Sequence, residues 1–428
     1  MTSENPARLV ARTREVAAAG SPLLRIPADV PAHRIYSWVR GEEGLVGWGA
    51  VAGISSRGPD RFDTAEQWWR ETSAAADVDD PVGLVGSGLV AFGSFAYAPD
   101  SAETSTLVVP EYVLGRREGR TFLTHTTRAD APREDVWTGT DEVPPPPGPG
   151  QVSFSDGALS GPAWQSTVAE AVDRITASDL DKVVLARDLL AETTHDIDPR
   201  HLLRRLADAY GNTWVFAVDG LVGATPEMLV RLERGLVTSR ILAGTIRRSG
   251  DEEKDLALAA SLAHSSKDLE EHEYAVASVA DVISRFCTSL NVPETPFVLH
   301  LPNVMHLATD VAGRVTNGAS SLRLASTLHP SAAVCGTPTS LADEVITELE
   351  QMDRGRYAGP VGWIDADGDG EWGIALRSGV IDPDDPRRMR LFAGCGVVAG
   401  SDPAAELAES DAKLVPMRSA LADESPSP

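Results

Sequence analysis

The chain has 428 residues, a formal net charge of −25 and 42% hydrophobic residues, values that suit a globular protein with a large buried core. Its 63 acidic and 38 basic residues disfavour nonspecific binding to nucleic acid or to an anionic membrane surface. The three cysteines lie far apart without a CxxC motif, which argues against a disulfide framework or a zinc ribbon.

The N-terminal segment, 1–20, predicts a capped amphipathic helix rather than a signal peptide. No apolar run reaches the roughly 18 residues that a membrane-spanning helix needs, so we expect a cytoplasmic protein without membrane contact. Farther along, the short apolar runs at 88–98 and 104–127 predict antiparallel strands and hairpins.

A Pro- and Gly-rich stretch at 140–162 lacks apolar periodicity and predicts a loop between an N-terminal part, 1–150, and a second region, 151–428. The segments expected after it are a helix around 164–175, strands within 182–192, 213–225, 227–239, 359–381 and 387–398, and helices within 252–286 and 339–352. Strands lie on both sides of the loop, and hairpins join them. We therefore expect one large α+β domain with mostly antiparallel sheets flanked by helices.

Two segments imitate known motifs without the surroundings that those motifs need. The glycines at 86–91 match a loose dinucleotide-binding fingerprint, but the residues that follow are not able to open a helix. The segment DADGDG, 365–370, resembles the start of an EF-hand loop, but Leu376 stands where that loop needs glutamate. This segment therefore predicts a hairpin turn.

Lysine is rare in this chain, and its positions are informative. It occurs only four times, whereas arginine supplies every other basic residue. Lysine differs from arginine in being able to lose its proton and act as a base. Lys182, which opens the apolar strand 182–192, is therefore a candidate base, with chance retention as the alternative.

Two predicted helices each carry a pair of carboxylates spaced by three residues, Asp268 with Glu271 and Glu406 with Glu409. This spacing places both members of a pair on one helix face. Two such faces suit a hard divalent cation such as Mg²⁺, which takes carboxylate oxygens and keeps positions for water and substrate. The spacing also suits two solvated helix faces in an acidic chain, and it leaves both interpretations open.

Turn residues mark two further candidate positions. Glu227 directly follows a turn at Thr225 and Pro226, between two predicted strands. Gly244 and Thr245 form a second turn that could present backbone N–H groups to a ligand.

Nine segments, taken together and in this order, resemble the chorismate-utilising enzymes. That family comprises isochorismate synthase, salicylate synthase, anthranilate synthase and aminodeoxychorismate synthase. The resemblance is strong over 155–420 and loose over 1–150, where only 90–98 contributes. The segments are KVVLAR, GATPE, LAGT, SSKDLEEHE, MHLATDVAG, LHPSAAVCGTP, RYAGPVGW, ALRSG and AGCGVVAGSDPAAELAESDAK.

The resemblance implies that chorismate is the substrate and Mg²⁺ the cofactor. By family position, Glu271 and Glu409 hold the metal, and Asp268 and Glu406 are second-tier or water-mediated ligands. The metal binds the ring carboxylate of chorismate, and Lys413 adds positive charge near it.

The same resemblance assigns the remaining site. Lys182 is the base that activates water, and Glu227 is the general acid for the C4 hydroxyl. Tyr357 and Arg377 hold the enolpyruvyl carboxylate, and His306 lies near the ring in either a packing or a catalytic role. Close backbone contacts come from Gly244, Thr245, Gly394 and Gly396.

The branches of the family differ in their nucleophile. Branches that add ammonia carry glutamine at the position of Lys182, and aminodeoxychorismate synthases usually carry lysine at the position of Ala243. The chain also lacks the DLGRND stretch of anthranilate synthases and any glutaminase domain. Water is therefore the expected nucleophile, and a monomer without a glutaminase subunit is the expected state.

Ala333 stands where salicylate synthases typically have threonine, which favours isochorismate synthase. Salicylate synthase, which forms isochorismate and then eliminates pyruvate, is the close alternative. A non-catalytic binding module of the same fold is disfavoured, because such a protein should have lost Lys182 or Glu227. Siderophore, menaquinone and other pathways all remain open as destinations of the product.

Overall fold

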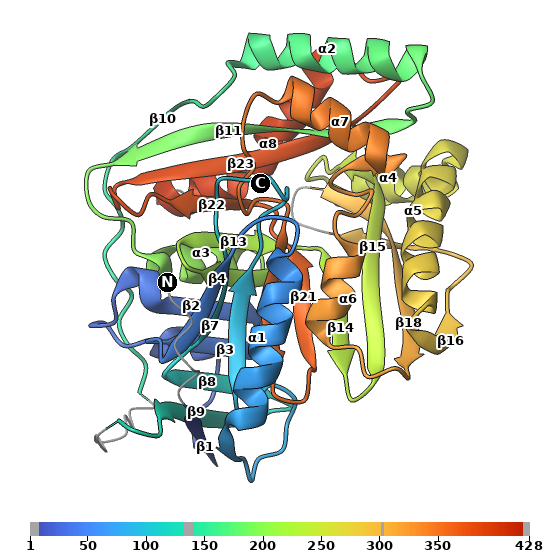
Figure 1. Ribbon diagram of the computed structural model, residues 1–428. Helices are drawn as coiled ribbons and strands as arrows, with labels where there is room; N and C mark the ends of the chain where they lie inside the picture. The colour runs from blue at the N-terminus through green and yellow to red at the C-terminus, as the bar shows by residue number, and fades with distance from the viewer. Residues whose placement is uncertain (1–7, 132–140, 301–303, 423–428) are drawn as a thin grey trace.

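The computed structural model describes residues 8–131, 141–300 and 304–422, and the side chains of Lys267 and Glu271 lie outside the described part. Within these residues, two large sheets pack against each other and carry helices around them (Figure 1). Every strand pair in the described part is antiparallel except β1 (Leu9–Glu15) with β5 (Asp77–Asp79). The expected α+β fold with mostly antiparallel sheets is confirmed.

Thirteen of the described strands form the first sheet, and β19 pairs with β11 beside the main path. In sheet order, the strands are β10 (Val152–Asp156), β11 (Lys182–Thr193), β23 (Arg388–Val398), β22 (Ser378–Ile381), β13 (Leu221–Thr225), β12 (Trp214–Val218), β2 (Ile35–Arg40), β3 (Glu43–Trp48), β8 (Tyr112–Arg117), β9 (Arg120–Arg128), β1 (Leu9–Glu15) and β5 (Asp77–Asp79), with β19 at Gly336–Thr337.

Ten described strands form the second sheet, and β17 pairs with β18 beside the main path. In sheet order, they are β16 (Cys287–Asn291), β18 (Val304–Val315), β15 (Leu236–Arg247), β14 (Met228–Glu233), β21 (Gly370–Ile374), β20 (Pro360–Asp365), β6 (Val90–Ser94), β7 (Ser105–Val109) and β4 (Ala52–Ser56), with β17 at Phe297–His300. Strands from before and after residue 150 are present in both sheets.

The described helices cover the outside of the sheets (Figure 1). They are α1 (Arg61–Ala75), α2 (Gly161–Ala177), α3 (Pro199–Ala209), α4 (Glu252–His264), α5 (Ser266–Ser284), α6 (Ser321–Leu328), α7 (Thr339–Leu349) and α8 (Pro403–Ala422), with short 3₁₀ turns η1 (Pro22–Arg25) and η2 (Ala32–Arg34). Helices α2 and α8 pack on each other beside β23, whereas α5 lies along β15 and β18. None of these helices has the length and apolar character needed to cross a membrane.

An aromatic cluster joins the two sheets. Trp38 and Phe216 of the first sheet pack in one buried cluster with Phe92 and Trp363 of the second. Because these rings are almost fully buried, with exposed fractions of 1% or less, the two sheets share one core. The site described below lies away from this cluster, near β11 and β23.

The prediction of an N-terminal helix within 1–20 is wrong, because residues 9–15 form strand β1. Leu9, Ala11 and Thr13 are buried and alternate with more exposed residues, as one face of a strand requires. The strand pairs with β9 and β5, whose residues lie more than sixty positions away in the chain. Tertiary pairing therefore decides this segment over its local helical character.

The segment 140–162 is only partly a loop. It contains strand β10, which pairs with β11, and α2 already begins at Gly161. The side chain of Ser160 accepts a hydrogen bond from the N–H of Ala163 and caps this helix. The expected hairpin turn at 365–370 is confirmed, because this segment joins β20 to β21.

Candidate active site

A cavity of about 440 Å³ lies where β11 and β23 of the first sheet come close to β15 and β18 of the second. The N-terminal parts of α5 and α8 border it. Every predicted site residue with a described side chain lines this cavity: Lys182, Glu227, Gly244, Thr245, Asp268, His306, Ala333, Tyr357, Arg377, Gly394, Gly396, Glu406, Glu409 and Lys413. Glu271 belongs to α5, but its side chain lies outside the described part.

Lys182 reaches the cavity across a glycine of the neighbouring strand. Strand β11 pairs with β23, so that Val184 lies opposite Gly396 and Ala186 opposite Gly394. A Cβ atom on Gly396 would come within 2.8 Å of Lys182 Cε and 3.4 Å of Nζ. The missing side chain at this position therefore makes room for the lysine.

Glu227 is a buried carboxyl group in the turn between β13 and β14. Its backbone N–H donates a 3.2 Å hydrogen bond to Thr225 Oγ1, which fixes the turn. Burial raises the pKa of Glu227 to about 7, and the charges of Arg377, Lys182 and Lys413 act against this rise. A carboxyl group with such a pKa still carries its proton on a large fraction of molecules at neutral pH, so it is able to act as an acid.

Arg377 places a guanidinium group in the cavity. Its backbone adopts a left-handed conformation, with φ of +50°, between β21 and β22. Its guanidinium makes no hydrogen bond or ion pair with the described residues, and burial lowers its pKa. The nearby carboxyl groups of Glu409 and Glu227 favour its charged form. Its N–H donors have no acceptor among the described residues, so they are open to an acceptor on a ligand in the cavity.

Tyr357 supplies a neutral hydroxyl group near Gly394. Its ring stacks on Phe392 with 5.1 Å between centroids, and burial raises the pKa of Tyr357. A Cβ atom on Gly394 would lie 3.3 Å from this hydroxyl. The hydroxyl group of Tyr357 therefore remains protonated. It is available as a hydrogen-bond donor next to the backbone of Gly394.

His306 contributes an uncharged imidazole. A bulge at Gly244, where φ is +73°, aligns Thr245 with His306, and their Oγ1 and Nδ1 atoms lie 2.9 Å apart. Burial, with the charges of Arg377 and Lys413, lowers the pKa of His306 to about 3. Its Nε2 atom is buried and has no partner among the described residues. A neutral ring nitrogen is thus left for a ligand.

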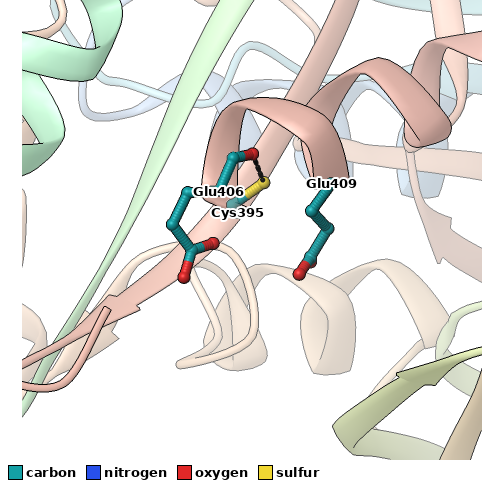
Figure 2. Close-up of side chains that lie close together, drawn as sticks. All are labelled: Cys395, Glu406 and Glu409. Carbon is teal, nitrogen blue, oxygen red and sulfur yellow. Dashed lines mark hydrogen bonds between the residues drawn. The ribbon is translucent and has the colours of Figure 1, made fainter. Parts of the chain in front are cut away.

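Two carboxylates project from the first turns of α8. Figure 2 shows Glu406 and Glu409 pointing to the same side, with the sulfur of Cys395 close to the helix backbone. One ligand atom from each of the three residues lies within 4.8 Å of the others. Burial raises the pKa of Glu406, and Ser401 Oγ donates a 2.7 Å hydrogen bond to its Oε1.

The carboxylates suit a hard cation better than the cysteine does. The Cys395 thiol donates to the backbone carbonyl of Glu406 at 3.2 Å, and burial raises its pKa to about 12. A protonated thiol is a poor ligand for Mg²⁺, which prefers oxygen. Asp268 of α5 adds a further carboxylate to the same cavity. The two α8 carboxylates therefore suit a hard cation such as Mg²⁺, whereas Asp268 lies outside the group of ligand atoms within 4.8 Å of one another.

Lys413 joins α8 to strand β23 at this place. Its Nζ forms a 2.6 Å ion pair with Glu409 Oε1 and donates a 2.9 Å hydrogen bond to the carbonyl oxygen of Gly394. Because Lys413 is largely buried, this contact is weakly screened by solvent. The lysine therefore links Glu409 of α8 to the backbone of β23.

Sequence reasoning missed three residues of the site: Arg354, Ser401 and Cys395. Arg354 and Ser401 line the cavity, and Cys395 lies beside the α8 carboxylates. A signal for Arg354 was present, since Glu350 precedes it by four residues, a spacing that suits an ion pair. No comparable pattern singles out Ser401 or Cys395.

A larger cavity of about 920 Å³ lies elsewhere in the molecule. The Pro-rich segment 146–150 forms part of its wall, together with Pro383 and Pro386. None of the predicted catalytic or metal-binding residues with described side chains lines it. The smaller cavity is therefore the candidate active site.

The fold and this cavity define a class of protein. Residues 3–422 match the family model described as chorismate binding enzyme, and the chain belongs to this family. The chain is 33% identical over 410 residues to the isochorismate synthase MenF of Bacillus subtilis, covering 89% of this chain and 86% of that protein. It is 32% identical over 410 residues to the salicylate biosynthesis isochorismate synthase of Pseudomonas aeruginosa, with coverages of 90% and 84%.

A solved structure agrees with these relatives. The putative 2,3-dihydroxybenzoate-specific isochorismate synthase DhbC from Bacillus anthracis superposes with a TM-score of 0.75 at 30% identity. The match covers 93% of this chain and 98% of that one. The N-terminal part, which the sequence motifs matched only loosely, is included in the family match.

Proposed function

We propose that this protein is an isochorismate synthase, which interconverts chorismate and isochorismate. One observation carries the proposal: Lys182 and Glu227 line the same cavity, and burial raises the pKa of Glu227 to about 7. A base for water and an acid for a leaving hydroxyl group are the two groups that this substitution needs. The family membership and the names of the relatives point to the same reaction.

The reaction moves a hydroxyl group without changing the overall composition of the substrate. Lys182 takes a proton from water, and the water oxygen bonds to C2 of chorismate. The ring double bonds shift, and the C4–O bond breaks. Glu227 gives its proton to the departing oxygen, which leaves as water. Each step reverses, so isochorismate also returns to chorismate.

Two cationic regions of the cavity would receive the two carboxylates of chorismate. Arg377 and Tyr357 would hold the enolpyruvyl carboxylate, because the free guanidinium and the protonated hydroxyl both donate hydrogen bonds. The ring carboxylate would lie near Lys413 and the α8 carboxylates. Gly244, Thr245, Gly394 and Gly396 allow backbone to approach the ring, with the Nε2 atom of His306 beside it.

Mg²⁺ is part of this proposal. Glu409 and Glu271 would hold the ion, with Asp268 and Glu406 bound directly or through water, and the ion would stabilise negative charge that develops on the ring carboxylate. Glu409, which contacts Lys413 in this structure, would be one of the residues that hold the ion. Lys413 would contribute positive charge toward the substrate carboxylate.

An isochorismate synthase differs from a salicylate synthase in that it does not eliminate pyruvate from isochorismate. Elimination requires isochorismate to be held so that its C2 hydrogen meets the enolpyruvyl methylene carbon, and a misplacement near 1 Å costs on the order of 10²-fold in rate. The small Ala333 lines the cavity and has no hydroxyl group to fix this pose. We therefore assign the chain to the monofunctional branch. It would act as a monomer without a glutaminase subunit.

The test is incubation of the purified protein with chorismate and Mg²⁺ at neutral pH. We expect a mixture of chorismate and isochorismate with the same final ratio from either starting compound, measured by liquid chromatography. Salicylate and pyruvate should appear only in traces, and ammonium salts should yield no anthranilate. Pyruvate that accumulates in step with chorismate loss would make the protein a salicylate synthase. Absence of any turnover would favour a binding module.

Ala333→Thr is the matched variant for this test. If the argument on pose is right, the added hydroxyl raises the salicylate fraction above that of the unmodified protein. An unchanged salicylate fraction would remove Ala333 as the position that separates the two activities.

A further inference from the structure

We propose that Glu350 and Arg354 form a positioning pair that holds the Lys182 strand and the Ala333 turn in a fixed relation across the cavity. This inference rests on the proposed function, since it concerns the geometry of that reaction. Neither residue is proposed to touch the reacting atoms. The pair acts through the backbone that carries the base and through the turn that shapes the opposite wall.

The pair is among the most deeply buried in the molecule. The side chains of Glu350 and Arg354 are 2% and 3% exposed. Arg354 Nε donates a 2.8 Å hydrogen bond to Glu350 Oε2, and a second guanidinium nitrogen contacts Oε1. This two-point geometry fixes both side chains in the plane of the fork. On its other side, the guanidinium lies 4.4 Å from the ring centroid of Tyr97.

The pair replaces a missing strand neighbour of β11. On this edge, β11 pairs with β19 at residues 182–183 and with β10 at residues 189–193, and no described strand pairs with the residues between. Two backbone groups in this gap are bonded to the ion pair. The N–H of Ala186 donates to Glu350 Oε1 at 2.7 Å, and the carbonyl of Val184 accepts from Arg354 at 2.7 Å. Buried backbone groups need such partners.

The same guanidinium also reaches the turn that carries Ala333. Its remaining nitrogen donates to the carbonyl oxygen of Val334 at 2.8 Å, and the backbone of Cys335 accepts from Val184 at 2.8 Å. Val184, Ala186 and Val334 all line the cavity, two and four residues after Lys182 and one after Ala333. One arginine therefore links the strand of the base to the turn that faces the substrate.

A buried ion pair is a poor device for stability alone. Replacing such a pair with apolar residues of similar volume is often neutral or stabilising, whereas removing one partner is strongly destabilising. This pair fixes the relative position of two segments, because its two side chains bond to backbone groups of both β11 and the turn at Val334. Variants should therefore separate stability from turnover.

The first measurement compares Arg354→Lys and Glu350→Gln with a matched pair outside the cavity. Arg117 and Glu371 are also ion-paired, with side chains 11% and 8% exposed, and they link β8 to β21. Arg354→Lys keeps the charge but loses the fork. We expect kcat to fall by about 10- to 100-fold with KM changed less than about threefold. Arg117→Lys and Glu371→Gln should lose stability but retain kcat within about twofold.

The second measurement does not depend on turnover. Acetic anhydride labels lysine amines, and peptide mass spectrometry gives the labelling rate of Lys182 relative to Lys254, whose side chain is 75% exposed. If the pair positions β11, this ratio changes in Arg354→Lys and stays unchanged in Arg117→Lys. A wild-type protein without chorismate turnover would refute the proposed function, while the labelling ratio would still test the pair.

A double variant covers the case in which a single variant fails to fold. Glu350→Gln with Arg354→Gln removes both charges, so no buried charge is left unpaired. We expect its stability to recover toward wild type while its labelling ratio and kcat remain altered. The proposal is overturned if these variants keep wild-type kcat and a wild-type labelling ratio, because the pair would then act on stability alone.

Discussion

Replacing Glu227 with glutamine should change how stability depends on pH. The pKa of this carboxyl group rises from 4.5 to about 7 on burial in the folded protein. Between these values the folded state binds a proton that the unfolded state has lost, so wild-type stability falls as pH rises toward 7. Below pH 4.5 both states are protonated, and the cost is absent. Above about pH 8 the full cost of the buried charge is present.

The size of the effect follows from that pKa. A rise from 4.5 to about 7 corresponds to about 3 kcal/mol, at about 1.4 kcal/mol per pH unit. Because Glu227 is only 8% exposed, solvent screening reduces this figure little. Glutamine is similar in shape and never ionises. We therefore expect the stability of Glu227→Gln relative to wild type to increase by about 3 kcal/mol from pH 4.5 to pH 9.

Urea denaturation of both proteins across this pH range measures the difference, in which the other titrating groups cancel. Glu371→Gln is the control. It is also buried, but its Arg117 partner leaves its pKa below the ordinary value, so its effect should be constant above pH 5. A pH-independent difference for Glu227→Gln would refute the reasoning. Glu227 would then be ionised at neutral pH and unable to serve as the acid.

Three further predictions concern the proposed base Lys182, the neighbouring Gly396 and the proposed Mg²⁺ ion. Lys182→Arg should lose about as much rate as Lys182→Ala, on the order of 10²- to 10⁴-fold, and a variant that keeps its charge and most of its activity would contradict the role of base. Gly396→Ala should displace Lys182, because the added Cβ would lie 2.8 Å from Cε, and should lower kcat by about 10-fold or more; Gly211→Ala, whose nearest atom would be 3.9 Å away, is the control. EDTA should abolish activity and Mg²⁺ restore it, and calorimetry should show about 10- to 100-fold weaker Mg²⁺ binding by Glu409→Gln; equal binding would remove Glu409 from the ligands.

Much of the site was predictable from local patterns. The i, i+3 spacing of Glu406 and Glu409 indicates one helix face, and the structure places both in the cavity with Lys413. The scarcity of lysine singled out Lys182, which also lines the cavity. Turns at Glu227 and Gly244 were visible as well, because Pro and Gly limit or extend the backbone locally.

The remainder depends on contacts that are distant in sequence. Segment 9–15 became a strand because β9 and β5 complete its hydrogen bonds. The left-handed backbone of Arg377 has no glycine to signal it, and the unpaired state of its guanidinium is visible only in three dimensions. The proposed positioning role of Arg354 likewise depends on its hydrogen bond to a backbone group in β11, more than 100 residues away. Pairwise spacing within a segment does not carry such information.

The sharing of both sheets by the two parts of the chain has a consequence for synthesis on the ribosome. Strand β12 pairs with β2, and β20 pairs with β6, so each sheet joins residues from before and after 150. Strands β2 and β6 emerge first and wait for β12 and β20, which are made much later. Until then they present unpaired edges, which are prone to associate with other chains. A fragment of residues 151–428 would keep all the catalytic residues but expose the edges of β12 and β20. This part of the chain should therefore aggregate when it is expressed without residues 1–150.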